Sequence, residues 1–210
     1  MRPIKQDTIS ITLSMLALLI SVYFSTFELG LLNIFPAFLL VAGISFQAFV
    51  NKKIEYDGAG VASNGKDMLM WILVAVAGIG LASFMSGLGG LLIPQTIVSL
   101  SVLDRAIFGV LMAVSEEQFF RGFLTAFFWT RLKSVAFAVL SSTAIFTVYH
   151  LAVYNSDPSA LIYVFVAGAV LSLTAIKSGK ITVPIVGHII NNLISVGAVG
   201  FITGGMIIGF

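Results

Sequence analysis

Two adjacent glutamates and an arginine stand inside a long apolar stretch, in the sequence SEEQFFR at residues 115–121. Glu117 and Arg121 are four residues apart, so on a helix they share a face and can pair directly. Glu116 is rotated by about 100° from Glu117 and is not neutralised in the same way. A free carboxylate can serve as a general base. The spacing therefore predicts one structural glutamate and one chemical glutamate.

The two histidines of the chain also lie in apolar segments. His150 follows Phe146 by one helical turn, and His188 precedes Asn192 by one turn on the same face. A single histidine in a helix is more often a packing residue. Polar groups in hydrocarbon must, however, find one another. We therefore expect Glu116 to face both histidines and Asn192, while Glu117 pairs with Arg121.

The composition identifies the kind of molecule that must position these residues. Of 210 residues, 59% are hydrophobic and 10% are charged, and the mean hydropathy is +1.08. Soluble domains are only about 45–50% apolar, so the predicted class is a polytopic, all-α membrane bundle. The length suits a single domain, residues 1–210. The absence of cysteine excludes thiolate metal sites and cysteine nucleophiles, and the dispersed net charge of +2 argues against nucleic-acid binding.

A membrane-spanning helix needs about 20 apolar residues, and the chain divides into about seven such segments. We place them at residues 8–26, 30–50, 67–86, 103–129, 134–154, 159–176 and 183–208. The segment 87–94 is either an interfacial or a re-entrant piece. With a cytoplasmic N-terminus, nearly all lysines and arginines fall on the cytoplasmic side, apart from Arg105 and Arg121. This predicts seven spans with the C-terminus outside.

Three motifs in the chain resemble those of the CPBP family, which comprises CAAX proteases and bacteriocin-processing enzymes. They are EExxxR at 116–121, FxxxH at 146–150 and HxxxN at 188–192. They occur in the family's order within about residues 100–195, whereas the first hundred residues carry no motif. The resemblance implies one membrane-embedded peptidase domain, in a prokaryotic cell membrane, that acts on a membrane-associated or lipid-modified peptide.

The resemblance also implies roles for the motif residues. Glu116 would activate water with help from His150. His188 and Asn192 would bind and polarise the scissile carbonyl and its oxyanion, a preorganised electrostatic role. The residues that would support the site are Glu117, Arg121 and Phe146.

The sequence leaves open whether the site holds a metal. Both a metalloprotease and a metal-free, glutamate-dependent mechanism have been argued for this family. Glu116, His150 and His188 could form a zinc site of two histidines and one carboxylate. No HExxH helix supports such a site, so the interpretation leans towards no metal, with a divalent ion such as Zn as the alternative.

Two other functions fit the same residues. Membrane carboxylates and histidines also build proton relays in transporters, although no inverted repeat is visible. A non-catalytic immunity or scaffold member of the family is the other alternative.

The predicted depths of the site residues in the membrane differ, so these residues would not meet in straight, level helices. Counted at about 1.5 Å per residue, Glu116 and His150 lie about 20 and 24 Å from the cytoplasmic side, but His188 only about 8 Å. We expect the turn at 177–180 to dip into the membrane. A separation of more than about 12 Å between His188 and Glu116 would defeat a shared site.

Overall fold

The structure of the chain is a computed structural model. It describes residues 65–86, 101–151, 154 and 157–207, and the side chains of this set up to residue 197. Every regular element in this part is a helix, which confirms the predicted all-α class. The elements, in chain order, are α3 (Gly65–Met85), α5 (Val102–Glu117), η3 (Gln118–Thr125), α6 (Ala126–Leu132), α7 (Val135–Leu151), α8 (Pro158–Ser178) and α9 (Thr182–Ile207).

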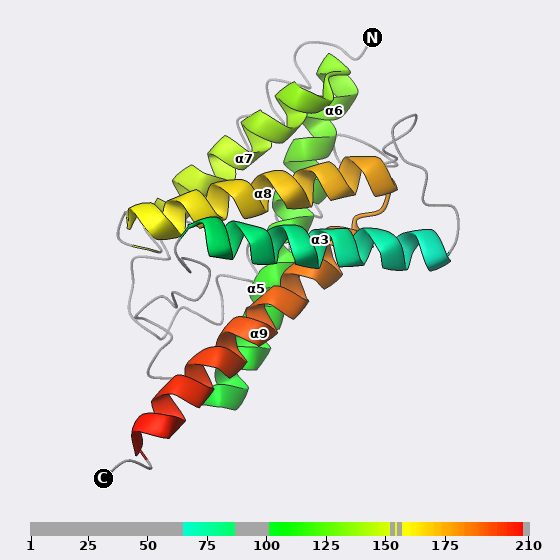
Figure 1. The fold of residues 1–210 in the computed structure, drawn as a ribbon. Coiled ribbons are helices and arrows are strands. Elements are labelled where there is room, and N and C mark those ends of the chain that lie inside the picture. The colour runs from blue at the N-terminus through cyan, green and yellow to red at the C-terminus, as the bar shows by residue number, and fades with distance from the viewer. Residues whose placement is uncertain (1–64, 87–100, 152–153, 155–156, 208–210) are drawn as a thin grey trace.

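The helices α5, η3 and α6 follow one another without a break and pass behind α3 and α8 in Figure 1. α3 and α8 lie side by side, and α8 also packs against α7. α9 packs along α5 and crosses α3. Every side chain from Phe119 to Phe127 is buried. This segment is therefore the centre around which the other helices are arranged.

The element η3 is a π-helix of eight residues that begins directly after the glutamate pair. In a π-helix the backbone N–H bonds to the carbonyl five residues earlier, so each turn is wider than in an α-helix. Such segments occur often at functional sites. The spacing of Glu117 and Arg121 was interpreted with the geometry of an α-helix, and the structure has a π-helix from Gln118 onwards instead.

Helix ends show the capping chemistry that their residues favour. Ser101 accepts a hydrogen bond from the Asp104 N–H at the start of α5, and Asp157 accepts one from the Ala160 N–H at the start of α8. These bonds satisfy amide groups that the first turn leaves without partners. Gly179 ends α8 with a φ of 68°, a conformation that glycine adopts without a steric penalty.

The outer faces of the bundle are apolar. α3 and α8 are long and apolar enough to cross a membrane, and within the described residues α7 and the Thr182–Gly197 part of α9 are shorter apolar helices. Large side chains such as Leu73 and Phe84 on α3 are exposed. An apolar outer surface around a polar interior is what a bilayer requires.

Five of the predicted spans can be compared with the structure. Four of the five, 67–86, 134–154, 159–176 and 183–208, coincide with α3, α7, α8 and α9 to within about three residues. The span 103–129 corresponds to the continuous run α5–η3–α6. The segments 8–26, 30–50 and 87–94 lie outside the described residues.

Candidate active site

The two glutamates occupy the last turn of α5, where the chain enters the π-helix. Glu116 is 4% exposed and Glu117 is fully buried. A buried carboxylate is strongly disfavoured unless it finds hydrogen bonds or an opposite charge. The neighbours of the two carboxylates therefore decide what each can do.

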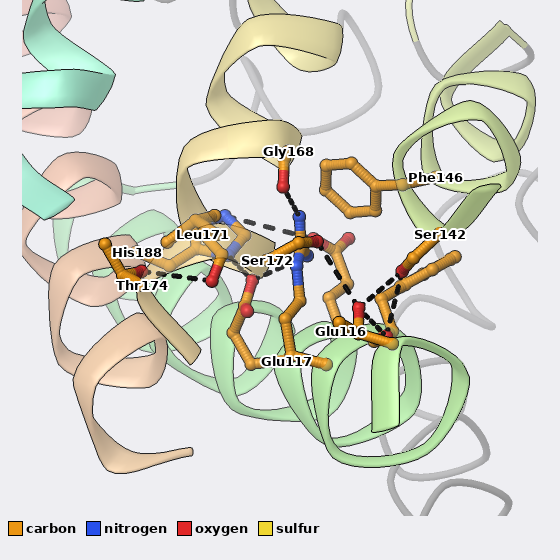
Figure 2. Close-up of polar contacts among 12 residues, drawn as sticks. Glu116, Glu117, Ser142, Phe146, Gly168, Leu171, Ser172, Thr174 and His188 are labelled. Carbon is orange, nitrogen blue, oxygen red and sulfur yellow. Dashed lines mark hydrogen bonds and ion pairs between the residues drawn. The ribbon is translucent and has the colours of Figure 1, made fainter. Parts of the chain in front are cut away.

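Glu117 is held by two short contacts that meet at one oxygen. Arg121 Nη1 donates to Glu117 Oε1 at 2.8 Å, and His188 Nδ1 lies 2.8 Å from the same oxygen (Figure 2). The predicted pair of Glu117 and Arg121 is thus present across the junction of α5 and η3. The contact with His188 was not predicted, and it joins α5 to α9.

Arg121 is fully buried and is surrounded by groups that suit a planar cation. Its Nη2 donates to the carbonyl oxygen of Gly168 on α8 at 3.1 Å, and its guanidinium lies 4.3 Å from the ring centroid of Phe146 (Figure 2). A cation over an aromatic face is attractive. A Cβ atom at Gly168 would meet Phe146 at 3.1 Å and Arg121 Nη2 at 3.4 Å. The missing side chain therefore lets α8 reach the arginine.

Glu116 faces the two histidines without a direct hydrogen bond. His150 Nε2 lies 3.9 Å from Glu116 Oε1, and His188 Nε2 lies 3.9 Å from Glu116 Oε2. These distances are too long for hydrogen bonds. They are nevertheless far below the separation of about 12 Å that would have excluded a shared site. The structure thus brings Glu116, His150 and His188 together.

The hydrogen-bond partners of the Nδ1 atoms define what the two Nε2 atoms can do. His150 Nδ1 lies 2.8 Å from the backbone oxygen of Phe146, and His188 Nδ1 contacts the carboxylate of Glu117. Both partners can only accept, so each Nδ1 carries a proton. In a neutral ring the Nε2 atom then offers a lone pair. Phe146 thus fixes the tautomer of His150, a role that its place in the motif did not reveal.

Asn192 is one turn beyond His188, and its amide reaches the helix that carries the glutamates. Asn192 Nδ2 donates to the carbonyl oxygen of Gly109 on α5 at 2.9 Å. An amide nitrogen has two hydrogens, so one of them is engaged in holding α9 against α5. The backbone of α9 comes close here because Gly109 has no side chain, and a Cβ atom there would lie 3.4 Å from Asn192 Cβ.

The structure shows two contacts near the site that the sequence had not indicated, one made by Asn191 and one by Tyr154. Asn191 Nδ2 donates to the phenol oxygen of Tyr163 on α8 at 2.7 Å. The ring of Tyr154 stacks on the imidazole of His150, with centroids 5.8 Å apart and an interplanar angle of 16°. Asn191 beside Asn192 was the available signal, since two polar residues in an apolar helix need partners.

The side chains around Glu116 bear on whether the site could hold a metal ion. Among the described residues no group of three His, Asp or Glu side chains is arranged to hold a metal ion. Glu116 meets each histidine through a different oxygen, at 3.9 Å in both cases. Among the described residues, the donor set therefore gives no support for a metal centre.

An all-α bundle with apolar faces and a buried cluster of glutamates and histidines defines the class, a membrane-embedded helical protein with an internal polar site. Comparison with known proteins narrows this class. Residues 98–194 match the family described as "Type II CAAX prenyl endopeptidase Rce1-like". This match over residues 98–194 supports the resemblance to the CPBP/CAAX protease family that the three motifs indicated. No curated protein and no solved structure matches the chain.

The match covers all three motifs and the helices that carry them. It begins just before α5 and ends in α9, two residues after Asn192. The family is one of proteases, so the class of activity it supports is that of a peptidase in a membrane.

Proposed function

We propose that the chain is an intramembrane endopeptidase in which Glu116 activates the attacking water. The observation that carries this proposal is the difference between the two glutamates. Glu117 is occupied by Arg121 and His188, whereas Glu116 faces two imidazole nitrogens at 3.9 Å. A separation of 3.9 Å is spanned by one water that contacts both atoms at about 2.8 Å.

The water between Glu116 and His150 would attack the scissile carbonyl carbon. Its oxygen forms the new C–O bond, and its proton passes to Glu116, the general base. Collapse of the tetrahedral intermediate breaks the C–N bond, and Glu116 returns the proton to the leaving amine. The lone pair on His150 Nε2 holds the second hydrogen of the water and so orients the attack.

His188 would stabilise the oxyanion by donating a hydrogen bond from Nε2. This role needs a hydrogen on Nε2 as well as on Nδ1, hence an imidazolium ring. With His188 in this form, the two carboxylates, the Arg121 guanidinium and the imidazolium of the proposed mechanism sum to zero charge. A buried cluster without net charge is far less costly than a charged one. In the proposal, Asn192 directs its second amide hydrogen to the same oxyanion.

The substrate class we propose is a membrane-associated or lipid-modified peptide, such as a prenylated C-terminal peptide. The support is the family match, whose description names a CAAX prenyl endopeptidase, and the burial of the site among apolar helices.

We also propose a cytoplasmic N-terminus, an external C-terminus and a site that opens to the cytoplasm. Ala126, Ala138 and Ala175 pack in one cluster, which brings the α6–α7 turn and the α8–α9 turn to the same end of the bundle. Those turns carry the basic residues Arg131, Lys133, Lys177 and Lys180. Clustered lysines and arginines favour the cytoplasmic side.

The test is cleavage of a farnesylated CAAX peptide by purified protein in lipid, compared with Glu116→Gln. This substitution keeps the shape of the side chain and removes the base. We expect the rate to fall by about 10²- to 10⁴-fold, with the fold and peptide binding retained. Equal cleavage by both proteins would contradict the role of Glu116.

Two further measurements on Glu116→Gln, a cellular phenotype and proton coupling, would point to other functions. A cellular phenotype that survives Glu116→Gln would indicate a scaffold, and a loss of proton coupling without any cleavage would indicate a carrier. A separate treatment with a strong chelator tests the metal-free mechanism. If cleavage is lost and only added zinc restores it, that mechanism is overturned.

A further inference from the structure

Three hydroxyl groups from three different elements meet in the buried interior of the bundle. Thr125 Oγ1 in η3 lies 2.7 Å from Ser142 Oγ in α7 and 3.3 Å from Ser172 Oγ in α8. Thr125 is fully buried, and the two serines are at most 1% exposed. We call Thr125, Ser142 and Ser172 the hydroxyl cluster; Ser142 and Ser172 are labelled in Figure 2.

The hydroxyl cluster converges on one backbone oxygen inside the π-helix. Thr125 Oγ1 and Ser142 Oγ lie 2.9 and 3.0 Å from the carbonyl oxygen of Phe120. Phe120 and Thr125 are five residues apart, which is the pairing distance of a π-helix. The hydroxyl cluster therefore binds the wide turn itself, and it ties that turn to α7 and α8.

The wide turn sets the orientation of Arg121, and of its pair with Glu117, relative to α8. Adding or removing one residue from a helical turn rotates everything beyond it by about 100°. If η3 relaxed to an α-helix, Arg121 could keep its 2.8 Å contact with Glu117 Oε1, because residues four apart share a face of an α-helix. Its direction relative to α8 would change, however, and the 3.1 Å contact with the Gly168 carbonyl would be lost. The pair of Arg121 and Glu117 would then lose its anchor on α8. Glu117 in turn holds His188.

We infer that the hydroxyl cluster is a positioning device, which stabilises the π-helical turn and thereby keeps Glu117 and His188 in the geometry of the site. Its members do not touch the reacting atoms. The inference rests on the proposed function for its effect on catalysis, but its effect on His188 can be measured without any substrate.

The state of His188 can be measured by NMR with few overlapping signals, because the chain contains just two histidines. Labelling with ¹⁵N-histidine gives NMR signals from two imidazole rings. His150 is bonded to a backbone carbonyl and His188 to Glu117. Thr125→Val, which keeps the shape and removes the hydroxyl, should shift the His188 ring nitrogens and leave those of His150 in place. Cleavage of the farnesylated CAAX peptide should fall by about 10- to 100-fold in kcat, with KM little changed.

Two control variants separate a hydroxyl effect from a packing effect. Thr125→Ser keeps the hydroxyl and should restore both the His188 signal and the rate. Thr174→Val removes another buried hydroxyl, which bonds only within its own helix, to the Leu171 carbonyl at 3.0 Å (Figure 2). It should change neither readout.

An unshifted His188 signal in Thr125→Val would overturn the inference, as would an equal shift in Thr125→Ser or in Thr174→Val. If Thr125→Val does not fold, Ser142→Ala decides the question by the same two readouts. A wild-type protein that fails to cleave the peptide would count against the proposed function, whereas the histidine spectra would still decide this inference.

Discussion

The polar site has two sides that are built from neighbouring residues of the same type. On the Glu117 side, each group is bonded at 2.8–3.1 Å, from His188 through Arg121 to the Gly168 carbonyl. On the Glu116 side, the two histidine Nε2 atoms lie 3.9 Å from the carboxylate oxygens. Identical carboxylates, adjacent in sequence and both buried, thus have different environments. One side is held by short hydrogen bonds, and on the other side the distances between Glu116 and the two histidines are too long for hydrogen bonds.

This difference follows from where the helices approach. α8 reaches the Glu117 side because Gly168 has no side chain, and η3 turns Arg121 towards it. On the other side, His150 is held by its own helix through Phe146. In the proposed mechanism, the partners on the Glu117 side would preorganise His188, so that little reorganisation is needed when charge develops on the oxyanion.

The largest effect on stability is expected for Glu117→Gln. It leaves the buried Arg121 guanidinium without its carboxylate, and breaking a buried ion pair in this way costs about 3–5 kcal/mol. Glu116→Gln removes no hydrogen bond seen between described residues and should change stability much less. Thermal unfolding of both variants in the same detergent measures the contrast.

Equal destabilisation by the two substitutions would remove the distinction between the two sides. A stable Glu117→Gln protein with full activity would also show that Glu117 does not hold His188. In either case the assignment of one structural and one chemical glutamate would have to be abandoned.

A smaller effect is expected for Gly168→Ala. The added methyl group would meet Phe146 at 3.1 Å and Thr143 at 3.3 Å, and overpacking of this kind costs about 1–3 kcal/mol. Gly80→Ala in α3 is the matched control, since nothing lies within 4 Å of a Cβ there. It should be neutral or stabilising by about 0.5–1 kcal/mol. Denaturation of the two variants and their peptide cleavage should separate them, and similar values for both would contradict the close approach at Gly168.

The class, the helices and the meeting of three motif residues could be predicted from the sequence. Apolar run lengths define the spans, and polar residues in such runs have few possible partners. The pairing of Glu117 with Arg121 followed from helical spacing, and the structure shows it at 2.8 Å. The roles of the site residues and the dip of the turn at 177–180 stay predictions.

Other features depend on contacts between segments far apart in the chain. The π-helix is stabilised by Ser142 and Ser172, 17 and 47 residues beyond Thr125, so a local pattern does not reveal it. The bond from His188 to Glu117 spans 71 residues, and the sequence had assigned His188 to Glu116 instead. Gly168 resembled any small residue of a membrane helix until Arg121 was seen beside its backbone.

The central claim is that Glu116 activates water and does not itself attack the peptide. Single-turnover cleavage of the farnesylated CAAX peptide in H₂¹⁸O tests this most directly. The account predicts one ¹⁸O in the newly formed carboxylate of the product, no ¹⁸O in Glu116, and labelled product from Glu116→Gln only at a rate about 10²- to 10⁴-fold lower. Incorporation of ¹⁸O into Glu116 would show a covalent acyl intermediate on that residue, and labelled product from Glu116→Gln at the wild-type rate would show that the base lies elsewhere.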